Sequence, residues 1–228
     1  MSLNSPYPQP HPTRTPAVAI AVFAAMVGGC AGLLPSPQPG SILFQDDFSR
    51  ASSGWDRYRD SSVESDYSAD TYQIAVYEPE RIAWSRPGLR FTDVVIDVDA
   101  TVTDGPENNA LGVICRYQDP QNFYFFLISA DGFAGIGQRL DGVQTMFNDA
   151  AMLPADSIVH GQSTNHLRAE CSGPRLTLSI NGVPARQAAA DAFESGDVGL
   201  LAGTYDLPGT RVSFDSFSVR QPELPLNS

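Results

Sequence analysis

The sequence predicts an all-β domain in which two antiparallel sheets pack as a sandwich, behind an N-terminal signal or anchor segment. Two observations carry this prediction. About 11 to 13 short apolar runs, separated by Gly, Pro, Asn and Asp, follow one another through about 180 residues. No segment shows the long 3.6-residue periodicity of an amphipathic helix, whereas several alternate with a period of two.

The N-terminus has the organisation of an export signal. Residues 1–15 carry Arg14 and no acidic residue, Ala17–Val27 is uninterruptedly apolar, and two glycines precede Cys30. The sequence V-G-G-C resembles a bacterial lipobox, which implies that residues 1–29 are a lipoprotein signal peptide and that Cys30 is lipidated. An uncleaved anchor over the uncharged residues 17–34 and ordinary cleavage are the alternatives. Because Arg14 would stay on the inner side, we expect an extracytoplasmic, membrane-anchored protein of a bacterium.

A tether and a tail flank the predicted domain. Residues 30–40 hold three prolines in the stretch A-G-L-L-P-S-P-Q-P-G, which favours an extended spacer of roughly 30 Å. The predicted β-sandwich covers residues 41–220. Residues 221–228 are expected to fray as a tail.

The first part of the domain reads as short strands around one polar loop. Ala51–Asp70 is polar and rich in turn formers, and we expect Trp55 to anchor it. Within Phe91–Val102, apolar residues alternate with Asp97 and Asp99, as in a strand with one solvated face. The strands expected before the centre of the chain are Ser41–Phe48, Thr71–Tyr77, Arg81–Ser85 and Phe91–Val102.

The centre of the chain, Ala110–Ala130, predicts a hairpin buried on both faces. Its two runs, Leu111–Tyr117 and Phe123–Ser129, are apolar at odd and even positions alike, and an Asp-Pro turn separates them. If Tyr117 pairs with Phe123, the charged Arg116 lies beside Tyr124 on one face.

The last part of the domain reads as hairpins. Asp141-Gly142, Ser172-Gly173-Pro174 and Asn181-Gly182 are turn signals between apolar runs. The strands expected here are Gly135–Arg139, Gln144–Phe147, Asn165–Cys171, Arg175–Ile180, Val198–Ala202 and Arg211–Val219.

The charge of the chain excludes several function classes. Its 228 residues carry a net charge of −12 with a pI near 4.4, which disfavours a nucleic-acid partner. All 14 basic residues are Arg, so chemistry that needs Lys, such as a Schiff base or a P-loop, is excluded. We expect several arginines to pair with the 26 acidic residues.

Four segments resemble the concanavalin A-like lectin/glucanase superfamily. They are F-Q-D-D-F-S with S-G-W, G-V-I-C-R-Y-Q-D-P-Q-N-F-Y-F-F, N-H-L-R-A-E-C-S-G-P-R-L-T-L-S-I-N-G, and G-D-V-G-L-L-A-G with V-S-F-D-S-F-S-V. Laminin G-like modules and 3-keto-disaccharide hydrolase domains are the nearest relatives in this resemblance, which spans residues 41–220. It implies a jelly roll with a concave ligand-binding sheet. It does not choose among lectins, glycosidases and adhesive modules.

The catalytic motifs of such enzymes are missing from the sequence. Family 16 glycoside hydrolases carry E-x-D-x-x-E, which puts two carboxyl groups on one face of a strand. The nearest match is Asp97-Val98-Asp99, which also fits an ordinary solvated face. His160 and His166 flank a polar loop and have no evident partner, and no serine triad or zinc motif is present. We therefore expect a protein without catalytic activity.

Two further sites concern stability. Cys115 and Cys171 lie on predicted strands of an exported domain, which favours a disulfide, with two free thiols as the alternative. Asp46, Asp47 and Asp215 lie on the first and last strands, which neighbour each other in a jelly roll, so they could bind one structural calcium ion. The alternative for the carboxylates is an Arg pair or a turn cap.

The predicted ligand site combines Arg116, Tyr124 and Trp84 on the concave sheet. A guanidinium beside a phenol ring, with an indole as a second platform, suits a carbohydrate. The alternative is that Arg116 neutralises Asp99 or Glu170. The sequence thus favours a non-catalytic module that binds carbohydrate or another cell-surface component. A hydrolase of the 3-keto-disaccharide type and a structural spacer are the competing hypotheses.

Overall fold

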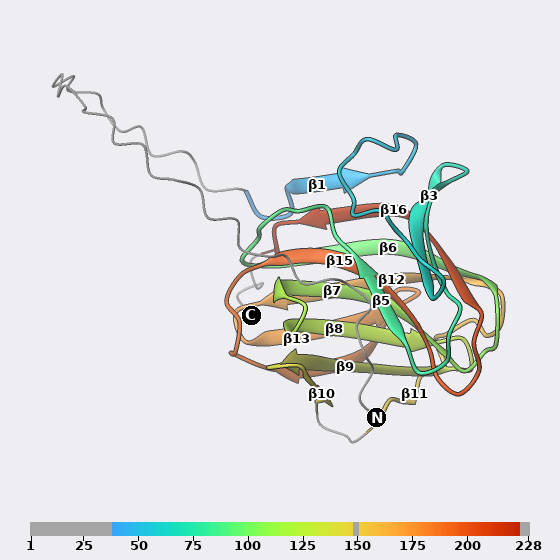
Figure 1. Ribbon diagram of the computed structural model, residues 1–228. Coiled ribbons are helices and arrows are strands. Elements are labelled where there is room, and N and C mark those ends of the chain that lie inside the picture. Colours follow the sequence, from blue (N-terminus) through green and yellow to red (C-terminus); the bar gives the residue numbers. More distant parts are fainter. Residues whose placement is uncertain (1–37, 148–150, 224–228) are drawn as a thin grey trace, which may run out of the picture.

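The computed structural model describes residues 38–147 and 151–223, which form two stacked antiparallel sheets (Figure 1). The predicted fold class, an antiparallel jelly-roll sandwich, is confirmed. Every regular element in these ranges is a strand, so they contain no helix that could cross a membrane. The predicted signal peptide and Cys30 lie outside the described residues.

Nine strands form the sheet at the back of Figure 1. In spatial order they are β14 (Val183–Ala189), β13 (Arg175–Ile180), β12 (Thr164–Ser172), β6 (Val94–Asp104), β16 (Thr210–Arg220), β4 (Thr71–Val76), β3 (Val63–Ser68) and β2 (Tyr58–Arg59), with β1 (Ile42–Asp46) also paired to β16. The first and last strands are therefore neighbours, as the sequence predicted.

Seven strands form the front sheet. Their order is β10 (Val143–Met146), β9 (Phe133–Leu140), β8 (Asn122–Ser129), β7 (Asn109–Asp119), β15 (Asp197–Thr204) and β5 (Ile82–Ser85), with β11 (Leu153–Pro154) paired to β9. The described residues thus hold 16 strands, more than predicted. The additional strands are β2 and β11, which have two residues each, β14, which buries no residue, and β3, which buries only Val63 and Ser65. Their sequences therefore lack a buried apolar run.

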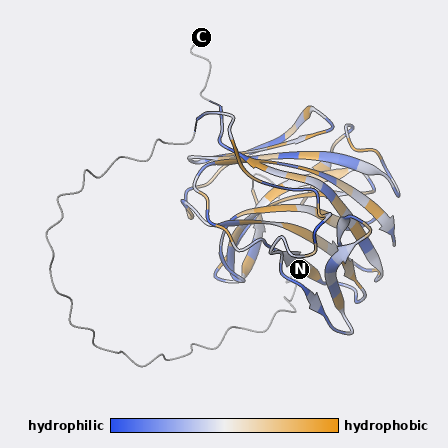
Figure 2. Ribbon diagram, turned by 90° about the horizontal axis from the view of Figure 1, so that it is seen from above, coloured by the Kyte–Doolittle hydropathy of each residue, from blue (hydrophilic) through white to orange (hydrophobic). Residues whose placement is uncertain are grey.

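The main core lies between the sheets, and a second apolar cluster lies on the outer face of the front sheet. Along β7, Leu111, Val113 and Cys115 join the inter-sheet core, whereas Ala110 and Ile114 belong to the second cluster. Hydrophobic segments accordingly occur in the strands of both layers when the sandwich is seen from above (Figure 2). The prediction that the central hairpin is covered on both faces is confirmed by the burial of both sets.

Trp55 anchors the first loop as expected. Its indole N–H donates to the Asp46 carboxylate at 2.9 Å, and its ring packs on Phe48 and Phe217. The loop is held at the edge of the core by a hydrogen bond whose donor and acceptor are both buried.

The predicted register of the central hairpin is wrong. Cys115 pairs with Tyr124 and Asp119 with Asn122, so the three residues between Cys115 and Asp119 face only Phe123. The extra residues form a bulge, at which Arg116 adopts a φ of 50°. The periodicity of the two apolar runs could not reveal this bulge, because both faces of the hairpin are apolar.

The predicted disulfide between Cys115 and Cys171 is present. Cys115 is on β7 of the front sheet and Cys171 is on β12 of the back sheet, and both are fully buried. The bond therefore joins the two layers through the core.

We expect the double variant Cys115→Ala/Cys171→Ala to lose about 4 kcal/mol of unfolding free energy, because the bond closes a loop with a sequence separation of 56 residues. Urea denaturation measures the loss. The wild type unfolded in a reducing agent is the control and should match the variant. Equal stability of the variant and the oxidised wild type would contradict the stabilising role of the bond.

Candidate functional site

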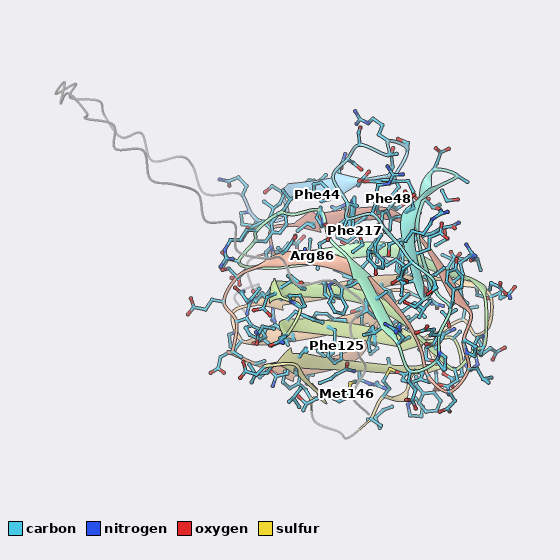
Figure 3. The ribbon with its side chains drawn as sticks, in the orientation of Figure 1. Phe44, Phe48, Arg86, Phe125, Met146 and Phe217 are labelled. Carbon is cyan, nitrogen blue, oxygen red and sulfur yellow. A yellow bond between two sulfur atoms is a disulfide. The ribbon has the colours of Figure 1, made fainter. Side chains whose placement is uncertain are left out.

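The outer face of the front sheet, here called the front face, carries large apolar side chains between glycines. Its apolar cluster comprises Ile82, Trp84, Ala110, Ile114, Tyr117, Phe123, Phe125, Leu127 and Leu201. Phe125 and Met146 lie in front of this sheet in Figure 3. A Cβ at Gly137 would collide with the Phe125 ring, and one at Gly135 with the Met146 methyl group. The glycines thus let large side chains lie flat across neighbouring strands, which builds a dense apolar floor.

The bulge in β7 places one aromatic ring on this floor. Strict alternation from Ile114 on the front face through Cys115 in the core would turn Tyr117 inward. The bulge reverses that direction, so Tyr117 joins the front cluster and stacks on Phe123 with 5.5 Å between the ring centroids. The geometry of the front face thus depends on a local irregularity.

Arg86 lies over this ring and links two carboxylates. Its guanidinium carbon is 4.1 Å from the centroid of Tyr117, a cation–π contact, and the side chain lies in front of the sheet in Figure 3. Nη1 lies 3.4 Å from Asp197, and Nη2 lies 3.2 Å from Asp56. We call Asp56, Trp84, Arg86, Tyr117 and Asp197 the Arg86 cluster.

Asp197 holds Arg86 from below. Its carboxylate is buried and accepts hydrogen bonds from the backbone N–H groups of Gly88, Leu89 and Val198. Burial raises the pKa of this carboxyl, while these donors and the charge of Arg86 oppose the rise. With its oxygens occupied in this way, Asp197 is a holding group for the arginine.

Asp56 forms the accessible side of the cluster. Its side chain is 43% exposed, against 27% for Arg86 and 6% for Asp197. The backbone around it is fixed, because its N–H donates to the Arg86 carbonyl and its own carbonyl accepts from the hydroxyls of Tyr72 and Ser85. An exposed carboxylate thus stands at a fixed place beside a guanidinium.

The sequence analysis identified only Trp84 of this cluster. Trp84 lies on β5 in the front-face cluster, is 2% exposed, and has its ring centroid 6.4 Å from that of Tyr117. Trp84 is therefore a buried packing partner of Tyr117 and not an exposed platform for a ligand. Arg86 directly follows the short apolar strand β5, and this position is the one sequence signal that could have pointed to it. Its carboxylate partners, Asp56 and Asp197, come from distant segments, so the sequence could not show that the three residues meet.

Arg116 and Tyr124 are not side by side on the front face. Tyr124 points into the inter-sheet core, where its hydroxyl accepts from the Phe193 N–H at 3.0 Å. Arg116 is 3% exposed and donates to the carbonyls of Thr92, Gly173 and Phe193.

The carboxylate partner of Arg116 is Asp93, at 2.9 Å, and not Asp99 or Glu170. Glu170 pairs instead with Arg175. These contacts favour a scaffold role for Arg116, while ligand binding by Arg116 and Tyr124 stays a prediction.

The three carboxylates predicted to bind calcium have other contacts. Asp46 accepts from the Phe48 N–H and from Trp55, Asp47 caps Ser49, and Asp215 accepts from the Ser216 N–H.

Asp46 and Asp47 line a polar hollow of about 340 Å³ beside the bulge of β16. The described part of the chain holds no group of three or more His, Cys, Asp or Glu side chains placed to hold a metal ion. Calcium binding remains a prediction.

Asp97, Asp99 and His166 meet on the outer face of the back sheet. His166 lies on β12, with Nδ1 2.8 Å from Asp99 and Nε2 3.4 Å from Asp97, so it has partners that the sequence did not reveal. Arg168 also lies 3.4 Å from Asp97. This polar group is on the opposite side of the sandwich from the Arg86 cluster.

Solved structures of other proteins share the fold of this chain. No family model matches the chain, and no curated protein matches it. Among solved structures, carbohydrate-binding module CBM66 from Bacillus subtilis matches with a TM-score of 0.61 at 16% identity, over 74% of this chain and 96% of that one. A Bacillus subtilis protein of unknown function with a galectin-like fold matches with a TM-score of 0.59 at 13% identity, over 81% and 97%.

A glycoside hydrolase domain has the same architecture. The GH16 protein of the Bacteroides ovatus mixed-linkage glucan PUL matches with a TM-score of 0.55 at 10% identity, over 78% of this chain and all of that one. At such identities the likeness establishes a common jelly-roll architecture, as the resemblance to the concanavalin A-like superfamily implied. Function has to be argued from the site.

We expect Arg116→Ala to lower the unfolding free energy by about 3 kcal/mol, because it leaves buried carbonyl oxygens without donors. Chemical denaturation measures this loss. Arg57→Ala is the matched control: it breaks an exposed pair with Asp66 and should lose less than about 1 kcal/mol. If Arg116→Ala kept wild-type stability but lost ligand binding, Arg116 would belong to a ligand site instead.

Proposed function

We propose that this protein is an exported module that binds carbohydrate through the Arg86 cluster of its front face. The observation that carries the proposal is the ion pair between half-buried Arg86 and exposed Asp56, fixed beside an aromatic and apolar floor. Carbohydrate-binding sites need a few fixed polar groups on a rigid surface, because sugar hydroxyls both donate and accept hydrogen bonds. The likeness to CBM66 and to a GH16 protein, both named for carbohydrate chemistry, supports this choice.

The geometry favours binding over hydrolysis. A glycosidase needs two carboxyl groups that flank the scissile bond, one of them as an acid. Of the two carboxylates in the cluster, Asp197 is buried and accepts from three backbone N–H groups and from Arg86. It is not available to a substrate, and Asp56 alone does not supply both roles.

We also propose that the domain is held at a membrane by a lipid on Cys30. The apolar run before Cys30 and the proline-rich tether after it support this arrangement. The tether would hold the front face clear of the membrane surface, where it could reach cell-surface or environmental glycans.

We expect a glycan array to detect binding by the detergent-extracted full chain, and Arg86→Ala to weaken this binding because the hydroxyl-binding donor is lost. Arg168→Ala is the control, since it removes an exposed arginine from the opposite outer face. Melting temperatures verify that both variants fold. Absence of any bound glycan with the wild type would refute carbohydrate binding.

We expect mass spectrometry of the membrane-extracted protein to show a chain that begins at a lipid-modified Cys30. Cys30→Ala should abolish this modification and leave the N-terminal segment uncleaved, because the modified cysteine is the attachment point. A wild-type chain that retains residues 1–29 without lipid would disprove the lipoprotein assignment.

A further inference from the structure

Half-buried Arg86 and buried Arg116 differ in how they use their N–H donors. Arg116 donates from all three of its nitrogens to carbonyls and to Asp93. Arg86 has contacts of 3.2 and 3.4 Å from its Nη atoms, and its buried Nε has no hydrogen-bond partner among residues 38–147 and 151–223. A guanidinium has five N–H donors, of which four are on its two Nη atoms. The buried Nε–H cannot reach a ligand, but the two Nη contacts do not use all four of those donors, so Arg86 retains capacity for an additional acceptor.

The charges around Arg86 select the kind of acceptor. The two carboxylates of Asp197 and Asp56 more than balance its single positive charge, and the whole chain carries a net charge of −12. A carboxylate or sulfate on a ligand would approach the exposed Asp56 and be repelled. A neutral hydroxyl meets no such penalty, because it can accept from Arg86 or donate to Asp56.

The spacing of the pair fits two hydroxyls together. Nη2 of Arg86 and Oδ2 of Asp56 lie 3.2 Å apart, so a donor and an acceptor stand side by side at the accessible edge of the cluster. Adjacent hydroxyls of a sugar ring are separated by about a hydrogen-bond length. One hydroxyl can therefore donate to Asp56 while its neighbour accepts from Arg86.

We propose that the Arg86–Asp56 pair binds the vicinal hydroxyls of a neutral saccharide. This inference rests on the proposed carbohydrate-binding function and adds the ligand class and the residues that read it. Tyr117 and Asp197 are positioning residues, because they hold the guanidinium in place from below.

Affinity electrophoresis of the detergent-extracted full chain tests the proposal. The gels contain amylose, galactan, mannan or β-glucan as neutral probes and polygalacturonate or alginate as acidic ones. A second set contains the neutral polysaccharides after periodate oxidation, which cleaves the bond between carbons that carry adjacent hydroxyls. We expect at least one neutral polysaccharide to retard the wild type, its oxidised form not to, and the acidic probes to be inert.

The variants assign the binding to the pair. Asp56→Asn removes the acceptor charge at an exposed position and should weaken binding about tenfold. Asp99→Asn, on the opposite outer face, is the control and should bind as the wild type does. Matching melting temperatures exclude unfolding as the cause.

Each other outcome overturns a specific statement. Unchanged binding by Asp56→Asn, undiminished binding of the oxidised polysaccharide, or a preference for the acidic probes would overturn this inference and leave the carbohydrate-binding function standing. A wild type that no polysaccharide retards would overturn the proposed function, and this inference with it.

Discussion

The bulge at the end of β7 is the constraint on which both faces of the front sheet depend. Cys115, just before it, is bonded to Cys171 of the back sheet, and Arg116 within it donates to carbonyls of two separate loops, at Gly173 and Phe193. Two consecutive residues thus connect the front sheet to the back sheet, through Cys115, and to two loops, through Arg116. The positive φ of Arg116 is maintained because these contacts determine where its side chain must lie.

The same bulge makes the candidate site. It turns Tyr117 to the front face, where the ring supports Arg86, while β15 has its own irregularity between Asp197 and Gly199. Two irregular strand segments therefore bring an aromatic ring to the face of one guanidinium and a buried carboxylate to its edge. A regular ladder would have left Tyr117 in the core, and Arg86 without that support.

Periodicity predicted the sandwich because burial on one or both faces leaves a direct trace in the sequence. The turns at Asp141 and Asn181 could also be predicted, because a tight hairpin turn needs residues that tolerate a positive φ and Asp and Asn do so. Both residues have a positive φ in the structure. The Arg86 cluster left no such trace, because its members come from four segments far apart in the chain. The bulge was hidden as well, since a shift of register within a run that is apolar on both faces does not change its pattern.

The exclusive use of arginine gains a physical meaning in this fold. Arg116 and Arg186 both direct their planar guanidinium at several backbone carbonyls, and Arg186 reaches from β14 to carbonyls of Ala134 and Pro154 near the edge of the front sheet. Lysine carries a single point of charge and could not hold several carbonyls in fixed directions. Arg86 uses the same planarity differently, with one face on Tyr117 and its edge toward two carboxylates. An arginine whose side-chain nitrogens all donate to the protein, such as Arg116, stabilises the fold. An arginine that keeps N–H groups at an accessible edge, as Arg86 does, has donors available for a ligand.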